Sequence, residues 1–195
     1  MAIFKPEDTA SAGGSYLGIV EVGIVGFEDK SSLFDWADIF IEVELSVKNS
    51  EFTNRMSILG EFDKDSEGKI VGGSVLKKLY RFFDAIGCTA GLTIEGKWED
   101  DDGKAIEDIA AYLKESYCTK NEPFVAYLYK KKPKPGKKVY TEVYPRLYPN
   151  DAAGKAACEK DIAWLKSKGH IKEATEADMI PDSSPTLANS ALNNL

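Results

Sequence analysis

The sequence predicts a mainly β protein with helices, an α+β fold built around an OB-like five-stranded barrel. Three observations predict this fold. Residues 39–47 alternate apolar and polar side chains, residues 75–86 carry apolar side chains at helical spacing, and two strand-like segments flank a lysine- and proline-rich loop near residue 134. Three strands, a helix and two further strands is the order of elements in an OB barrel. We also expect helical insertions and a C-terminal helix outside the barrel.

The first part of the chain accounts for three strands. Residues 16–27 read YLGIVEVGIVGF, and their three glycines predict a strand that bends or carries a bulge. In residues 39–47, IFIEVELSV, every second side chain is apolar, which predicts a strand with one buried face. A third strand is expected over residues 55–62. A polar turn then leads to residues 70–71, which extend or return that strand.

Helices and two more strands follow. Residues 75–86 place apolar side chains on one side of a helix, with Ser74 as its N-cap and Gly87 just beyond its end. We expect a short strand over residues 92–98, a turn at EDDDG and a second helix over residues 104–117. Two strands then flank the lysine–proline loop, and an amphipathic helix begins after Pro149.

This order divides the chain into four parts. A flexible arm over residues 1–15 precedes the OB-like domain over residues 16–149, and a C-terminal helix over residues 150–174 follows. Residues 175–195 contain three acidic residues, no basic residue, two prolines and little apolar content. We therefore expect these last residues to form a flexible tail.

The composition favours a cytoplasmic protein. The 195 residues carry 25 Lys or Arg and 32 Asp or Glu, a formal net charge of −7. No apolar run approaches the ~20 residues needed to cross a bilayer, and the first residues lack the pattern of a secretory signal. The three cysteines lie far apart and there is one histidine, so neither a disulfide framework nor a zinc site is expected. The overall negative charge repels polyanions, so any contact with nucleic acid has to be local.

One segment reverses the charge of the chain. Between Tyr127 and Tyr148 there are seven Lys or Arg, five tyrosines and a single acid, Glu142. Alternation within each strand places the tyrosines and basic side chains on one face and apolar side chains on the other. If the turn is centred on residues 133–136, the directly paired residues are Tyr129 with Tyr140, Lys131 with Lys138, and Tyr127 with Glu142.

A face that is both aromatic and basic suits single-stranded DNA. Bases stack on aromatic rings, at roughly 1–3 kcal/mol each, while cations neutralise the phosphates. The candidate binding residues are Tyr127, Tyr129, Lys131, Lys132, Lys134, Lys137, Lys138, Tyr140, Tyr144 and Arg146. Two alternatives stay open. The tyrosines pack beneath a neighbouring helix while the lysines only solubilise the loop, or the tyrosine face is the protein interface of a virion or other structural assembly protein.

Three stretches within residues 16–149 carry a family pattern. They read IEVELSVKNSEFTNRMSILGEFD, GGSVLKKLYRFFDAIGCTAGL and EPFVAYLYKKKPKPGKKVYTEVYPRLYP. The pattern is a strand pair, a helix ending in DAIG, and a strand with the spacing of Phe124, Ala126 and Leu128 before a basic loop. In these features the chain resembles the bacteriophage single-stranded DNA-binding proteins of OB fold.

The resemblance implies sequence-independent binding and protection of single-stranded DNA in phage-type DNA replication or recombination, in the host cytoplasm. It implies no catalysis and no cofactor. The partners it implies are single-stranded DNA and phage replication or recombination proteins that contact the C-terminal tail, and a homo-oligomer is compatible with the sequence. The last residues, SPTLANSALNNL, depart from the acidic ending of such proteins.

Three candidate chemical sites are set aside. Residues 63–68 imitate the front of a calcium loop, but Ser74 stands where the closing glutamate belongs. The acids at 99–102 are adjacent in sequence, and adjacent acids rarely converge on one metal ion. His170 follows a glycine typical of a helix end, and nothing places a nucleophile beside it. We expect no enzyme activity and no bound metal.

Overall fold

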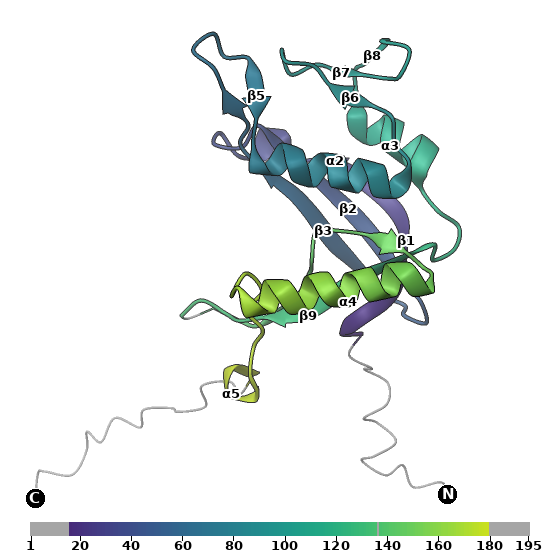
Figure 1. Cartoon of the computed structure of the whole chain (residues 1–195), viewed down its shortest axis with the longest axis vertical. Helices are drawn as coiled ribbons and strands as arrows, with labels where there is room; N and C mark the ends of the chain where they lie inside the picture. Colours follow the sequence, from purple (N-terminus) through teal and green to yellow (C-terminus); the bar gives the residue numbers. More distant parts are fainter. Residues whose placement is uncertain (1–15, 136, 180–195) are drawn as a thin grey trace, which may run out of the picture.

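The computed structural model describes residues 16–135 and 137–179 (Figure 1). The predicted arm, residues 1–15, lies outside these ranges, and so do residues 180–195 of the predicted tail. The described residues form an α+β fold in which strands predominate, as the sequence predicts. None of the described helices is long and apolar enough to cross a membrane.

The main sheet has the strand order β10-β9-β1-β2-β3, and all its neighbouring strands are antiparallel. Its strands are β1 (Gly18–Asp29), β2 (Ile39–Val47), β3 (Thr53–Gly60), β9 (Phe124–Lys131) and β10 (Tyr140–Val143), and a short strand, β11 (Tyr148–Pro149), also pairs with β9. β10 approaches β3, but no hydrogen-bonded ladder between described residues joins them, so this sheet is open.

The two strand predictions that rest on specific residues are confirmed. The register of β1 on β2 shifts between Ile24 and Gly26, which is the irregularity that the glycines of this strand predict. Gly23 is also required, because an added Cβ would lie 2.4 Å from the carbonyl oxygen of Asn121. In β2 every second residue is buried, as the alternation predicts.

The larger core lies between this sheet and the helices α2 (Ser74–Ile86) and α3 (Ile109–Tyr117). The side chains of Leu45, Ile58, Leu79 and Phe82 are fully buried in it, and each such side chain contributes about 1.5–3 kcal/mol by leaving water. α2 ends at Gly87, whose φ of 70° is left-handed, as predicted. Its N-cap is Gly73, and the predicted cap Ser74 is the first helical residue.

Several short elements lie outside the main sheet. They are a 3-10 turn, η1 (Ser31–Leu33), a hairpin of β4 (Asp63–Lys64) and β5 (Ile70–Gly72), and a small sheet of β6 (Gly91–Leu92), β7 (Trp98–Glu99) and β8 (Ala105–Ile106). The single strand predicted over residues 92–98 was wrong, because a turn separates β6 from β7. The helix predicted over residues 104–117 starts only at Ile109, because Asp108 caps it and accepts a hydrogen bond from the Ala111 N–H at 2.9 Å.

A second, smaller core lies on the other face of β9, beneath α4 (Ala152–Ser167), the expected C-terminal helix. Figure 1 shows α4 running along β9, apart from α2. The buried side chains of this core are Val125, Tyr127, Tyr129, Tyr148, Cys158, Ile162, Leu165 and Ile171. β9 is therefore covered on both faces. The start of the predicted tail forms a short helix, α5 (Glu176–Met179).

Candidate functional site

The hairpin formed by β9 and β10, which carries the lysine–proline loop, has a different register from the one predicted. In the structure Tyr140 pairs with Lys131 and Glu142 with Tyr129, so each residue of β10 lies opposite a residue two positions further along β9 than expected. The predicted pairing of Lys131 with Lys138 was therefore wrong. Glu142 instead forms an ion pair with Lys131, with Oε2 2.6 Å from Nζ. This pair lowers the cost of placing basic side chains on the hairpin.

The structure corrects the proposed stacking role of two tyrosines. Tyr127 and Tyr129 share a face of β9, as alternation predicts, but they are only 7% and 6% exposed. Their rings stack on each other at 5.8 Å and pack beneath α4. Neither ring has a free face for a base. The same burial withdraws Tyr127 and Tyr129 from any protein interface on this face.

Polar contacts hold Tyr127 in place under α4. Its hydroxyl donates a hydrogen bond to Glu173, while Lys166 lies 3.0 Å from the same carboxylate and 5.0 Å from the ring centre. Burial opposes ionisation of Glu173, but the hydrogen bonds from Tyr127 and Lys166 lower its pKa below the ordinary value. Burial raises the pKa of Tyr129, with a further contribution from the charge of Glu142.

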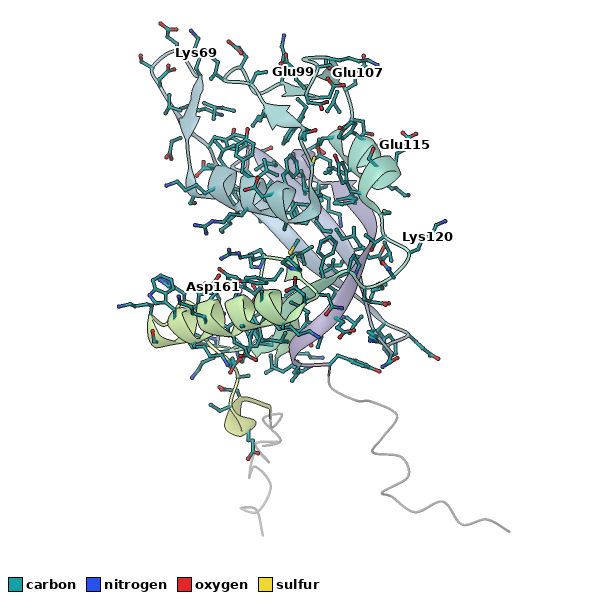
Figure 2. All side chains as sticks on the ribbon, turned by 45° about the vertical axis from the view of Figure 1, so that its right-hand side comes forward. Lys69, Glu99, Glu107, Glu115, Lys120 and Asp161 are labelled. Carbon is teal, nitrogen blue, oxygen red and sulfur yellow. The ribbon has the colours of Figure 1, made fainter. Side chains whose placement is uncertain are left out.

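A second set of contacts anchors the loop after β10. Arg146 forms an ion pair with Asp161 of α4, and its guanidinium lies 4.8 Å from the ring centre of Tyr148. The Tyr148 hydroxyl donates to the same carboxylate at 2.9 Å. Figure 2 shows Asp161 on α4, away from Glu99, Glu107 and Glu115 at the end of the molecule that carries β7, β8 and α3. Arg146 is thus already partly neutralised.

The chain after α4 returns to the hairpin. β1 pairs with β9 only as far as Leu128, which leaves the edge of residues 130–132 open. Residues 172–174 fill that edge. The Lys132 N–H donates to the Lys172 carbonyl at 2.8 Å, and the Ala174 N–H donates to the Lys130 carbonyl at 2.8 Å. This return brings the C-terminal segment beside the basic loop.

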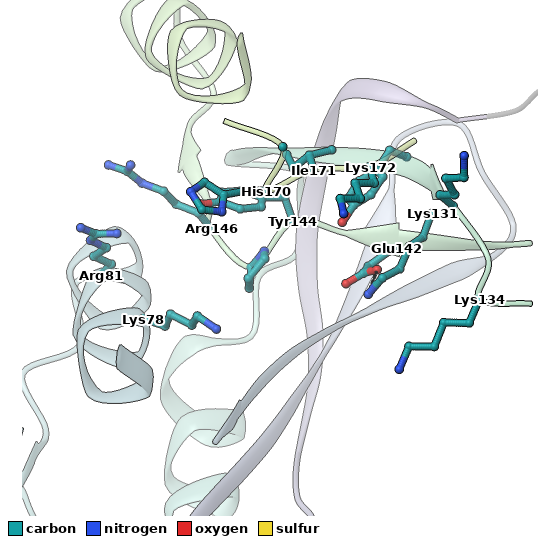
Figure 3. Close-up of a pocket in the computed structure, with 14 residues that line it drawn as sticks. Lys78, Arg81, Lys131, Lys134, Glu142, Tyr144, Arg146, His170, Ile171 and Lys172 are labelled. Carbon is teal, nitrogen blue, oxygen red and sulfur yellow. Dashed lines mark ion pairs between the residues drawn. The ribbon is translucent and has the colours of Figure 1, made fainter. Parts of the chain in front are cut away.

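These elements enclose a basic pocket of about 550 Å³. It lies between α2, the hairpin and the segment after α4, and Figure 3 shows side chains from all three around it. We call it the basic pocket, and its lining residues are Lys78, Arg81, Tyr129, Lys131, Lys132, Lys134, Glu142, Tyr144, Pro145, Arg146, Gly169, His170, Ile171 and Lys172. Seven of these are Lys or Arg and one is an acid.

Most of the cations in the basic pocket have no acidic partner. Lys131 pairs with Glu142 and Arg146 pairs with Asp161. The other five form no ion pair within 4.0 Å among the described residues, and they are Lys78, Arg81, Lys132, Lys134 and Lys172. Clustered like charges repel one another, so this arrangement favours an anionic ligand.

Glu142 is the one acid in the wall of the basic pocket. Its Oε2 is buried, lies in the ion pair with Lys131, and accepts no well-aligned hydrogen bond from any described residue. The ion pair with the Glu142 carboxylate raises the pKa of Lys131 above its ordinary value. Glu142 therefore pairs with Lys131, a cation that would otherwise be available to an anionic ligand.

Six of the ten predicted binding residues line the basic pocket. Lys131, Lys132, Lys134, Tyr144 and Arg146 line it, together with the buried edge of Tyr129. The predicted residues Lys137, Lys138 and Tyr140 are exposed on the loop and at the start of β10, outside the lining, and Tyr127 lies under α4.

Sequence reasoning missed the contributions of α2 and of the segment after α4. The missed residues that could bind an anion are Lys78, Arg81, His170 and Lys172. The two on α2 could have been found, since they lie on the polar side of a strongly amphipathic helix. Nothing in the sequence pattern places residues 170–172 beside the hairpin.

No protein-family model, curated protein or solved structure matches this chain.

Proposed function

We propose that this protein binds single-stranded DNA without sequence preference. The observation that carries the proposal is the cluster of five cations in the basic pocket that form no ion pair with any described residue, in a chain whose net charge is −7. Phosphates held there would release counterions from the strand, which is the main source of sequence-independent affinity.

Aromatic rings near these cations favour a single strand over a simple anion. Tyr144 lines the basic pocket, and Tyr140 is 53% exposed with the Lys131 Nζ 5.9 Å from its ring centre. Two stacked bases would contribute about 2–6 kcal/mol by the usual range for base–aromatic stacking. The bases of a duplex are already stacked on each other and would not reach these rings.

The connectivity of the main sheet supports an OB-like barrel. Three antiparallel strands, the helix α2 and a hairpin that returns beside β1 follow the OB order, and β10 approaches β3 where a barrel would close. In OB folds the loop between the last two strands is one of the loops that bind oligonucleotides. Here that loop carries Lys132 and Lys134 into the basic pocket.

The biological role we propose is coating and protection of exposed strands in phage-type DNA replication or recombination. This role rests on the resemblance to phage single-stranded DNA-binding proteins in the sequence stretches that form β2, β3, α2 and the hairpin. The protein would act by binding alone, in the host cytoplasm. Replication or recombination proteins that contact the C-terminal residues are the partners we propose.

A fluorescence titration with oligo-dT at several salt concentrations tests the proposal. If the five unpaired cations contact phosphates, the slope of log K against log salt is about −3.5, because each contact on a single strand contributes about −0.7. Affinity that is absent, or that stays level or increases as salt rises, contradicts the proposal and indicates a ligand held by apolar contacts.

Removing the single acid of the basic pocket is expected to strengthen binding. In Glu142→Gln, Lys131 loses its partner and becomes available to a phosphate. At about 0.5–1 kcal/mol for an exposed ion pair, oligo-dT binds roughly 2- to 5-fold more tightly in low salt. Glu159→Gln makes the same change of charge on the exposed side of α4 and serves as the control. A weaker complex with Glu142→Gln alone would show that the carboxylate positions Lys131 for the ligand.

A further inference from the structure

The outer side of α2 carries a second hollow, of about 320 Å³. Its walls include Leu76, Lys77, Tyr80 and Arg81, and its one acid is Asp84. A volume of about 300 Å³ or more is in the range of small-ligand sites. We call this hollow the α2 groove. It contains none of the residues that the sequence predicted for binding.

The α2 groove adjoins the basic pocket. Arg81 lines both, so its side chain borders the two hollows. Lys77 and Arg81 are one helical turn apart on the exposed side of α2, and Tyr80 lies beside Arg81. Lys78, the neighbour of Lys77, faces the basic pocket. The exposed side of α2 therefore continues the positive surface beyond the pocket.

Tyr80 presents a ring that is already held in position. The side chain is 37% exposed, although it lies on a helix whose other aromatic residues are buried. Its hydroxyl accepts a hydrogen bond from the Leu92 N–H at 3.2 Å, and its ring meets Phe83 edge to face at 6.4 Å. A ring fixed in this way loses little conformational entropy when a ligand stacks on it.

We propose that the α2 groove is a base-stacking subsite, in which a single strand leaving the basic pocket passes Arg81 and places a base on Tyr80. This inference rests on the proposed binding of single-stranded DNA and extends it to a second site. Lys77 and Arg81 hold the phosphates on either side of the stacked base. The bound DNA thus crosses α2 as well as the hairpin.

Length-dependent binding tests the subsite. Oligo-dT strands from about 4 to 16 nucleotides span the usual site sizes of OB-type domains. We expect Tyr80→Ala to weaken the complexes of the longer strands by about 5- to 150-fold, the range for one stacked base, and to leave the shortest strands unchanged. Tyr80→Phe keeps the ring and binds all lengths like the parent protein.

Two control variants separate this inference from the proposed function. Lys134→Gln changes only the basic pocket and weakens strands of every length. Phe52→Ala removes a ring that is 76% exposed on the turn between β2 and β3, and changes no complex. If the parent protein binds no strand, the proposed function fails. If it binds, and Tyr80→Ala behaves like the parent protein at every length, only the α2 groove is overturned.

Photo-crosslinking gives a readout that needs no variant. A 16-nucleotide strand carrying one 5-iodouracil at successive positions is irradiated with the full chain, and the modified peptide is identified by mass spectrometry. The label is expected on Tyr80 from a position several nucleotides away from the one that labels Tyr144. Labelling of hairpin residues without labelling of Tyr80 at any position overturns the subsite.

Discussion

Neutralising four cations of the basic pocket weakens oligo-dT binding by roughly 30- to 700-fold in low salt. The variant replaces Lys78, Arg81, Lys132 and Lys134 with Gln, and these side chains come from α2 and from the hairpin. Each lost contact costs about 0.5–1 kcal/mol, the range for exposed ion pairs, so four together cost about 2–4 kcal/mol. The salt slope falls in magnitude by about 2.8, since each contact contributes about 0.7.

A second variant with the same net charge separates the pocket from the general field of the protein. It carries Gln at four exposed lysines outside the pocket, namely Lys97, Lys104, Lys120 and Lys160. We expect its affinity to fall only a few-fold, because distant exposed charges are screened. Equal losses in the two variants would mean that net charge, rather than the pocket, governs binding.

Gly154→Ala is expected to destabilise the protein, although alanine is the better helix former. Gly154 is buried in the first turn of α4, and an added Cβ would lie 2.0 Å from the carbonyl oxygen of Pro149. Backbone cannot yield as a side chain does, so the start of α4 must shift away from Pro149. Overpacking of this kind costs about 1–3 kcal/mol, which lowers Tm by roughly 2–12 °C in a chain of this size.

Ala156→Gly, at an exposed position of the same helix, measures the effect of helix propensity alone on the stability of the protein. That change costs about 1 kcal/mol from propensity alone. The two results together test the contact, because propensity predicts that Gly154→Ala raises stability while the contact predicts that it lowers stability. Calorimetry of both variants distinguishes the two predictions. A Gly154→Ala protein at least as stable as the parent would refute the close contact between residue 154 and the Pro149 carbonyl.

Local patterns in the sequence predicted local structure well. The alternation in β2 and the helical spacing in α2 depend on burial of one face, which any packing partner satisfies. Gly87 ends α2 because glycine adopts a positive φ without strain. These features need no knowledge of what lies across the interface.

The site was predicted only in part because it depends on contacts between distant segments. Alternation showed that Tyr127 and Tyr129 share a face of β9, but it could not show that Ile162 and Leu165 of α4 cover that face. The apolar Val125 on the same face was a signal of burial. The predicted register of the hairpin was wrong because a loop rich in lysine and proline does not specify a single turn type.

The cover that α4 provides for β9 has a consequence during synthesis. β9 leaves the ribosome before α4 does, so for that interval the nascent chain exposes Val125, Tyr127 and Tyr129 on a strand of high β propensity. Such a strand is prone to associate with other chains until its helix arrives. A chain truncated between β9 and α4 would therefore aggregate. We also expect chaperones that bind unfinished chains to bind this hairpin.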